Sequence, residues 1–291
     1  MNLKRVYFDY NIYDSLAKDR MHLPENYSQH FKIYVSVAHA EEFFNATDKN
    51  DSEENREHIE KLRNLLTRDL NNSGVLNPTP TKIINKHEKF SDALQRVKHY
   101  DTRQSIEQNA EKIHESQKTK ATSLREQDKS SMDNSNLSFE DIWKRPEVIK
   151  GVGKCREEID LYNRSAVTAL IKDYGWYQAN LIARKSRLKP FDLQQNIFKG
   201  KRPNFYQLEF LMEFLQDVLN SCNYNRDKTI RTVNSGVYDT EHAIYATYCD
   251  YFVTEDKKLA KRLDAIYYFL GLETRCLSFE QWCNKIKEEN L

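Results

Sequence analysis

Short runs of β-branched and aromatic residues alternate with helical patterns at both ends of this 291-residue sequence. Near the N-terminus, residues 4–9 and 32–36 have the composition of strands, and Ser36 is a suitable N-cap for a helix over residues 37–46. Near the C-terminus, residues 250–256 are typical of a buried strand. Strands that alternate with helices predict an α/β fold whose central sheet is mostly parallel and covered on both faces.

The same alternation continues through the rest of the C-terminal third. Residues 205–219 have a strongly apolar helical pattern, and the sequence from Gly236 predicts a loop followed by a helix that Asp239 begins. A further helix is expected over residues 257–270, and a last strand over residues 273–277. These elements would complete the sheet and its covering helices.

The composition changes after Thr47, where polar helical patterns with a narrow apolar stripe replace the strand signals. We therefore expect a discontinuous core domain formed by residues 1–47 and 204–291, with residues 48–203 as a large α-helical insertion. The insertion is a candidate surface for self-association or for a protein partner.

Composition and charge limit the class of protein. Hydrophobic residues make up 39% of the chain, so a packed core is possible. The formal net charge is +1, so a nucleic acid would have to be held by a local patch. The five cysteines include no C-x-x-C pair, which favours a reducing compartment. No signal-peptide pattern or run of 18 apolar residues occurs, so we expect a cytoplasmic protein without a membrane span.

Two acidic residues follow predicted strands directly. Asp9 ends the first strand, and Asp256 ends the strand over residues 250–256, with Thr254 two residues earlier on the same face. Ligands of open α/β sheets bind in the crevice beyond the carboxyl ends of the strands, so both acids are candidate cation ligands. Each has a structural alternative as a turn or cap residue, and capping does not exclude metal binding.

Two further acids lie on helices near this edge. Asp239 is expected in the first turn of its helix, with His242 one turn further on as a packed or supporting residue rather than a ligand. Glu41 and Glu42 both follow the second strand. Because adjacent helical residues are about 100° apart, only one of these two glutamates can face a site.

The four acidic positions can converge on one end of a parallel sheet. Converging carboxylates raise one another's pKa unless a cation holds them together. Hard oxygen ligands suit Mg²⁺ or Mn²⁺ rather than zinc. Such a site activates water and neutralises phosphate charge, so phosphodiester hydrolysis is the predicted reaction.

Residues 6–11, 35–43 and 239–259 resemble the motifs of PIN-domain nucleases. In that family an Asp ends the first strand, a Glu lies six residues after a Ser, a third acid begins a helix, and a fourth lies in Thr-x-Asp. The resemblance implies catalytic and metal-binding roles for Asp9, Glu42, Asp239 and Asp256, supported by Asn11, Ser36, Glu41, His242 and Thr254. It implies a PIN-like three-layer fold and an Mg²⁺- or Mn²⁺-dependent endonuclease, usually acting on RNA and leaving a 5′-phosphate and a 3′-hydroxyl.

A basic stretch over residues 184–202 is a candidate nucleic-acid-binding surface, because clustered cations can hold phosphates. Phe198 and Phe205 are close enough in sequence to stack on bases. The alternative is an ordinary solvated surface. The basic residues are Arg184, Lys185, Arg187, Lys189, Lys199, Lys201 and Arg202.

Three functions remain open at this point. The first is an endonuclease that cleaves RNA, which includes ribonucleases of the toxin or defence type. The second is a DNA-directed or structure-specific nuclease. The third is a non-catalytic PIN-like scaffold that binds a partner through the helical insertion, and the presence of all four expected acids disfavours it.

Overall fold

The computed structural model describes residues 3–47, 53–69, 75–76, 84–85, 89–97, 134–160, 193–201, 203, 205–226 and 230–289. Among these residues, six strands form one sheet in the order β4-β3-β2-β1-β5-β6. Neighbouring strands from β3 to β6 in this order run parallel, and β4 pairs antiparallel with β3. The strands are β1 (Lys4–Phe8), β2 (Phe31–Ser36), β3 (Val75–Leu76), β4 (Ile84–Asn85), β5 (Tyr251–Val253) and β6 (Arg275–Leu277).

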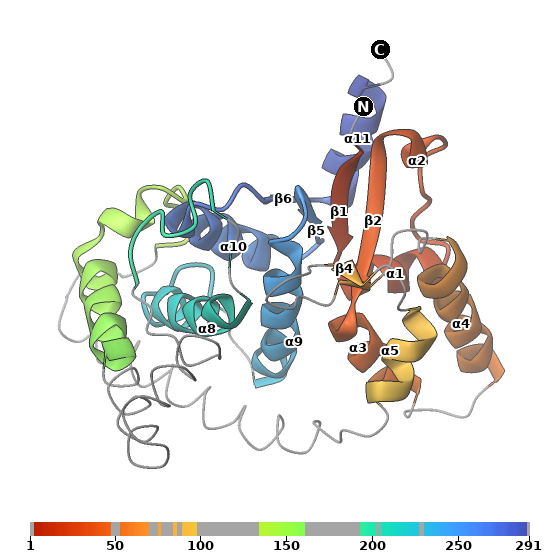
Figure 1. Ribbon diagram of the computed structural model, residues 1–291, viewed down its shortest axis with the longest axis horizontal. Coiled ribbons are helices and arrows are strands. Elements are labelled where there is room, and N and C mark those ends of the chain that lie inside the picture. The colour runs from red at the N-terminus through yellow and green to blue at the C-terminus, as the bar shows by residue number, and fades with distance from the viewer. Residues whose placement is uncertain are drawn as a thin grey trace, which may run out of the picture.

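Helices lie on both sides of this sheet. In Figure 1, α8, α9 and α10 lie on one side of the long strands, and α4 and α5 lie on the other. Residues 146–160 are also helical. The helices are α1 (Tyr10–Ala17), α2 (Tyr27–His30), α3 (Val37–Thr47), α4 (Glu53–Asn64), the π-helix η1 (Leu65–Asp69), α5 (Phe90–Val97), the 3₁₀-helix η2 (Ile142–Lys144), α8 (Phe205–Ser221), α9 (Ile230–Ala246), α10 (Lys257–Leu270) and α11 (Phe279–Glu289).

The central strands are apolar on both faces because each face is covered. Successive strand side chains point to opposite faces. Tyr7 of β1 therefore joins one buried cluster with α8, α9 and α10, while Val6 and Phe8 join a second cluster with α1, α3, α5 and α11. This arrangement confirms the α/β class and the mostly parallel, covered sheet that the sequence predicts.

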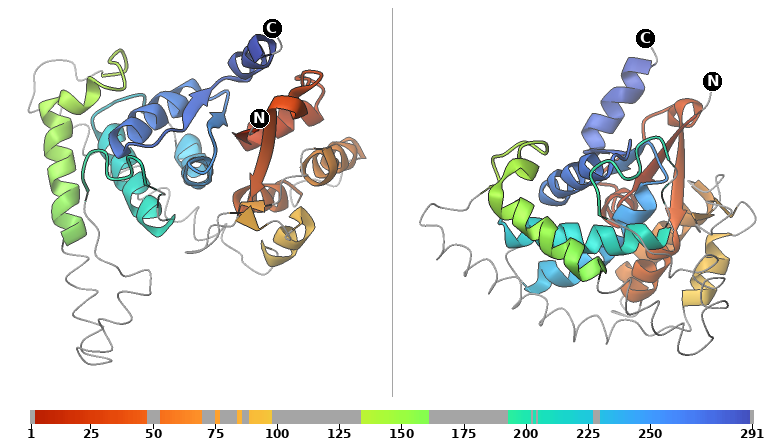
Figure 2. Two further views of the ribbon diagram at one scale, coloured as in Figure 1. Left: turned by 45° about the horizontal axis from the view of Figure 1, so that its top comes forward. Right: turned by 60° about the vertical axis from the view of Figure 1, so that its left-hand side comes forward.

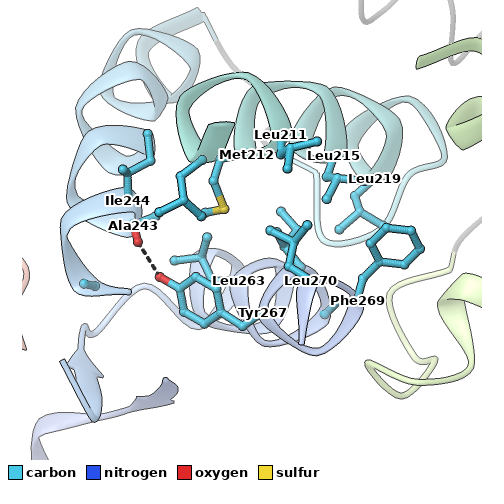
Figure 3. Packing of buried hydrophobic residues seen from close by; sticks show 14 of the residues in the cluster. Leu211, Met212, Leu215, Leu219, Ala243, Ile244, Leu263, Tyr267, Phe269 and Leu270 are labelled. Atoms are coloured by element: carbon cyan, nitrogen blue, oxygen red, sulfur yellow. Dashed lines mark hydrogen bonds between the residues drawn. The ribbon is translucent and has the colours of Figure 1, made fainter. Parts of the chain in front are cut away.

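The first buried cluster fixes α10 against α8 and α9. Figure 3 shows Leu211 and Leu215 of α8 facing Leu263 and Leu270 of α10. Burying side chains of this size stabilises the fold by about 1.5–3 kcal/mol each. The Tyr267 hydroxyl of α10 donates a hydrogen bond to the backbone carbonyl of Ala243 in α9 at 2.7 Å. Helix α9, which carries Asp239, and helix α10, which Asp256 precedes, are therefore packed in one layer.

Segment 48–203 differs from the helical insertion that the sequence predicts. Its residues 75–76 and 84–85 form β3 and β4 of the same sheet, and α4 and α5 pack against α1 and α3. Trp143 is buried in the first cluster and donates a hydrogen bond to the Ala265 carbonyl at 2.9 Å. The described parts of this segment thus belong to the core, because their apolar side chains fill space on both sides of the sheet.

The helix that carries Asp239 also differs from prediction. Helix α9 begins at Ile230, so Asp239 is in the helix interior and does not begin it. Gly236 lies within the helix, where glycine costs about 1 kcal/mol relative to alanine. Packing of the buried residues Ala243 and Ile244 stabilises the helix by more than this local cost.

The chain reverses its direction of progress across the sheet at β1. The strands after β1 first extend to β2 and β3, and β5 and β6 are then added on the other side of β1. In Figure 1, α11 lies at the end of the molecule where both termini are marked, and Figure 2 shows the arrangement from two further directions. Among the described residues, no helix has both the length and the apolar character needed to cross a bilayer.

Candidate functional site

The reversal at β1 is a topological switch point of the sheet, and we call the region beyond the carboxyl ends of β1, β2 and β5 the carboxyl edge. In open α/β sheets, ligands bind at such a topological switch point. Asp9 follows β1, Glu42 is on the helix after β2, and Asp256 follows β5. Helix α9, which carries Asp239, packs against β1, β5 and α3. We call Asp9, Glu42, Asp239 and Asp256 the acidic cluster.

Asp9 is held at the end of β1 by hydrogen bonds to its backbone and to its side chain. Its backbone N–H donates to the Val253 carbonyl at 2.9 Å, which ties it to β5. The side chain is 2% exposed, and its Oδ2 atom accepts hydrogen bonds from Thr254 Oγ1 at 2.7 Å and Asn11 Nδ2 at 3.3 Å. Asp9 occupies the N-cap position of α1 but makes no side-chain capping bond, so its carboxylate is available for another role.

Asp256 is the N-cap of α10, as one of its two sequence interpretations predicts. Its Oδ1 atom accepts from the backbone N–H groups of Lys258 at 2.8 Å and Leu259 at 2.9 Å. The Thr254 hydroxyl accepts from the Asp256 backbone N–H at 3.1 Å while donating to Asp9. Thr254 therefore joins the ends of β1 and β5 through a single buried hydroxyl.

A buried chain of polar side chains orients Glu42. The His242 Nε2–H group donates to Glu42 Oε2 at 2.8 Å. On the other side of the ring, Nδ1 is 2.7 Å from the Tyr7 hydroxyl, which is 2.5 Å from Ser36 Oγ. Burial alone lowers the pKa of His242, but the carboxylates of Glu42 and Asp9 outweigh it and raise this pKa. Tyr7 was not identified from the sequence, because a strand tyrosine usually packs in the core.

The buried His39 ring extends this series of polar contacts from Ser36 to the backbone of β1. The Ser36 backbone N–H donates to His39 Nδ1 at 3.1 Å, so the ring proton is on Nε2, which donates to the Phe8 carbonyl at 2.8 Å. Burial and the neighbouring His242 lower the pKa of His39, which keeps this ring neutral. The only sequence signal for His39 is its position three residues after Ser36.

Asp239 interacts electrostatically with the other three acids of the cluster. Burial raises its pKa well above the ordinary value, and the carboxylates of Asp9, Glu42 and Asp256 raise it further. The buried Arg262 guanidinium opposes them more weakly. The structure thus brings Asp9, Glu42 and Asp256 within electrostatic range of Asp239.

Glu42, rather than Glu41, faces the acidic cluster. Burial raises the pKa of Glu42, His242 lowers it, and Asp9 raises it. Glu41 interacts with Glu241 of α9 and with His242, so it lies beside the cluster. The spacing of six residues after Ser36 therefore selected the glutamate that interacts with Asp9.

The donor set is suited to a hard divalent cation in chemistry but does not form a closed shell of ligands. Among the described residues, no group of three or more His, Cys, Asp or Glu side chains is close enough together to hold a metal ion. Mg²⁺ commonly binds through only one or two carboxylates and keeps several waters, so an open arrangement of carboxylates is compatible with it.

The predicted nucleic-acid-binding residues are only partly described. Arg184, Lys185, Arg187, Lys189 and Arg202 lie outside the described residues. Lys199 and Lys201 are exposed on a segment that pairs with the C-terminal end of α10, where Phe198 N–H donates to the Leu270 carbonyl at 2.9 Å. The acidic cluster is at the other end of this helix, about 20 Å away at 1.5 Å per residue. Phe198 is buried, so it does not stack on bases as predicted.

Comparison with known proteins gives no assignment. No family model matches the chain, and no curated protein or solved structure matches it. The functional argument therefore depends on the sequence motifs and on the geometry of the carboxyl edge.

Proposed function

We propose that this chain is a PIN-like, metal-dependent endonuclease that hydrolyses phosphodiester bonds. One observation carries the proposal: the Asp239 carboxylate interacts with those of Asp9, Glu42 and Asp256 at the switch point of a parallel sheet. Ionised carboxylates that are gathered in this way repel one another unless a cation lies between them. Hard oxygen donors favour Mg²⁺ or Mn²⁺ for that role.

The residues of the chain have distinct parts in this proposal. One or two of the carboxylates of Asp9, Glu42, Asp239 and Asp256 would bind the cation directly and the others through its waters. The bound cation would polarise the phosphate and lower the pKa of a coordinated water. Thr254 keeps the Asp9 carboxylate in place, and the first turn of α10 does the same for Asp256.

The turn after β1 argues against the other common use of such a switch point. A dinucleotide site needs glycines there so that the backbone can approach the pyrophosphate. The turn in this chain is Asp9-Tyr10-Asn11, which contains no glycine and places an acid at the carboxyl edge. A gathering of carboxylates at this edge supports cation-mediated phosphate chemistry rather than direct phosphate binding.

RNA is the proposed substrate because of the resemblance to PIN-domain nucleases, and a cytoplasmic location remains a prediction of the sequence. A DNA substrate would use the same chemistry, so the substrate must be identified by assay. We propose measuring cleavage of end-labelled RNA and DNA, single- and double-stranded, with Mn²⁺, Mg²⁺ or EDTA.

The matched control is the double variant Asp9→Asn/Asp256→Asn. We expect cleavage of single-stranded RNA with Mn²⁺ or Mg²⁺, no cleavage in EDTA, and none by the double variant. Metal-dependent cleavage of DNA alone would change the substrate class. Equal cleavage by the wild type and the folded double variant would refute the proposal.

A further inference from the structure

Two aromatic side chains are exposed and in contact near the C-terminal end of α10. Among the described residues, four large apolar side chains are exposed, and two of these, Phe139 and Tyr268, touch each other. They are 40% and 41% exposed, and their ring centroids are 5.4 Å apart in an edge-to-face arrangement. Single exposed apolar side chains are common on protein surfaces, whereas adjacent ones indicate a surface that a partner covers.

This aromatic pair has a rigid support beneath it. Trp143, close in sequence to Phe139, packs on Phe269 with 4.4 Å between the ring centroids. The Trp143 indole N–H also donates to the Ala265 carbonyl of α10 at 2.9 Å. These buried contacts fix the segment that carries Phe139 against the helix that carries Tyr268. A surface that is already ordered loses little conformational entropy when it binds a partner.

Lysines lie beside the aromatic pair. The side chain of Lys144 is 75% exposed, and its ammonium interacts electrostatically with Tyr268. The segment that contains the exposed Lys199 and Lys201 pairs with the last two residues of α10 through backbone hydrogen bonds of 2.7 and 2.9 Å. We call Phe139, Lys144, Lys199, Lys201 and Tyr268 the aromatic patch.

The charges of the aromatic patch favour an anionic partner. Its three lysines outnumber the two exposed acids that interact with Lys144, which are Glu140 and Asp141. Asp141 pairs with Lys144 at 2.7 Å, but an ion pair this exposed contributes little stability, so a phosphate group can compete for the ammonium.

The exposed face of α10 leads from the aromatic patch to the carboxyl edge. Lys257, Lys261 and Tyr268 are exposed and follow the spacing of a single helical face. Asp264 lies on this face too, but it is half-buried and its carboxylate accepts a hydrogen bond from the Cys276 backbone N–H at 3.0 Å. At 1.5 Å per residue, Tyr268 is about 18 Å along the helix from the acidic cluster.

Lysines beside exposed aromatic rings are suited to single-stranded nucleic acid, because the ammonium groups hold phosphates and the rings stack on unpaired bases. We propose that the aromatic patch binds single-stranded nucleic acid and that the exposed face of α10 directs the strand to the acidic cluster. The direction of the strand rests on the proposed function, whereas binding at the patch does not. Phe139 and Tyr268 then take the stacking role that the sequence suggested for Phe198.

The experiment measures the binding of the full chain to fluorescein-labelled oligonucleotides by fluorescence anisotropy, in EDTA and over a series of salt concentrations. The probes are a single-stranded RNA, the same sequence as single-stranded DNA, and the RNA annealed to its complement. Phe139→Ala and Tyr268→Leu remove one ring each, Tyr268→Phe retains the ring, and Lys144→Met removes one charge. Circular dichroism checks the fold of each variant.

The matched control for Lys144→Met is Lys61→Met. Lys61 is also exposed and is paired with Asp19 at 3.2 Å, but it belongs to α4, on the other side of the sheet (Figure 1). Leu3→Ala is the control for the aromatic variants, because Leu3 is an exposed apolar residue that precedes β1.

We expect Phe139→Ala and Tyr268→Leu to weaken binding to both single strands by about tenfold, the usual effect of losing one stacked base. Duplex binding and the salt dependence should not change in these two variants. Lys144→Met should reduce the slope of log affinity against log salt concentration by about 0.7, because one phosphate contact is lost. Tyr268→Phe and both controls should bind like the wild type.

The outcomes separate this inference from the proposed function, because binding is measured without metal. Unchanged single-strand affinity in folded Phe139→Ala and Tyr268→Leu would overturn the inference even if the wild type cleaves RNA. Binding of the duplex alone would do the same. Loss of single-strand binding in both variants, together with a wild type that cleaves nothing, would support the inference and refute the proposed function.

Discussion

At the amino ends of the strands, which we call the amino edge, the acid Asp250 is paired with the cation Arg5. At the carboxyl edge, by contrast, acids lie near other acids. Asp250 precedes β5 and accepts a hydrogen bond from the Arg5 backbone N–H at 2.6 Å. The Arg5 guanidinium is 3.6 Å from the same carboxylate, and both side chains are 42% exposed. At the carboxyl edge, the charge of Asp239 adds to those of three other carboxylates.

This difference separates structural acids from candidate functional ones. A pair such as Arg5–Asp250 is locally neutral, solvated and needs no ligand. The acidic cluster is partly buried, and Arg262 lowers the pKa of Asp239 less than burial and the other carboxylates raise it. Burial beside like charge is costly, and such arrangements occur where function requires them.

The largest expected effect is the loss of cleavage in Asp239→Asn. Removing this carboxylate removes a ligand of the proposed cation while preserving shape, so the rate should fall by at least about a hundredfold. The measurement is the cleavage rate with saturating Mn²⁺. Asp250→Asn, at the opposite edge, should cleave at the wild-type rate. Equal rates for wild type and Asp239→Asn would remove this acid from the mechanism.

A second, smaller contrast lies within the carboxyl edge itself. Glu42→Gln should reduce cleavage by roughly tenfold or more, because Glu42 interacts with Asp9 and is oriented by His242. Glu41→Gln should reduce it less, because Glu41 faces Glu241. Parallel single-turnover rates test the pair. The reverse order would mean that Glu41 is the acid that serves the site.

At the amino edge, changes should affect stability without affecting chemistry. Gly271 ends α10 with φ +73°, and a Cβ atom there would lie 2.9 Å from the Asn196 Cα atom. We expect Gly271→Ala to lower the free energy of unfolding by about 1–3 kcal/mol. Gly153→Ala is the control, since a Cβ there meets nothing within 4 Å. Urea unfolding measures both, and an unaffected Gly271→Ala would contradict the predicted clash.

The smallest expected effects are on the free energy of unfolding in EDTA, which removes metal. These effects should have opposite signs for substitutions at the two edges. Burial and neighbouring carboxylates raise the pKa of Asp239 in the folded chain. Stability from this group is therefore present at low pH and is lost as pH rises from about 3.9, the usual unfolded value, through the raised pKa. At pH 7, Asp239→Asn should be more stable than wild type.

Asp250→Asn should instead be slightly less stable, by about 0–1 kcal/mol, because it loses a solvent-exposed ion pair. Thermal unfolding in EDTA at pH 7 and pH 4 tests both variants. The extra stability of Asp239→Asn over wild type should be smaller at pH 4 than at pH 7. A destabilised Asp239→Asn at pH 7 would mean that Arg262 compensates this acid fully.

Much of the fold and of the acidic cluster was predictable because local signals were strong. The runs that form β1 and β2 are rich in β-branched and aromatic residues. Asp9 directly follows β1, and Asp256 lies three residues after the end of β5. Parallel strands bring their carboxyl ends to one edge, so acids far apart in sequence meet there.

Other parts were not predictable for physical reasons. Strands β3 and β4 have two residues each, which is too short to show a period of two. The full length of α9 was missed, because Gly236 is a local helix-breaking signal that tertiary packing overrides. The contact between Tyr7 and His242 joins residues 235 positions apart, and no local pattern encodes it.

The most direct test of the central claim is thermal unfolding of wild type, Asp239→Asn and Asp250→Asn with Mn²⁺ or EDTA. A cation that binds only the folded chain stabilises it by about 2.7 kcal/mol at one hundred times its Kd. We predict that Mn²⁺ raises the Tm of wild type and Asp250→Asn similarly, and that of Asp239→Asn much less. A wild-type Tm that does not respond to Mn²⁺, or an equal rise in all three proteins, would contradict a cation site at the carboxyl edge.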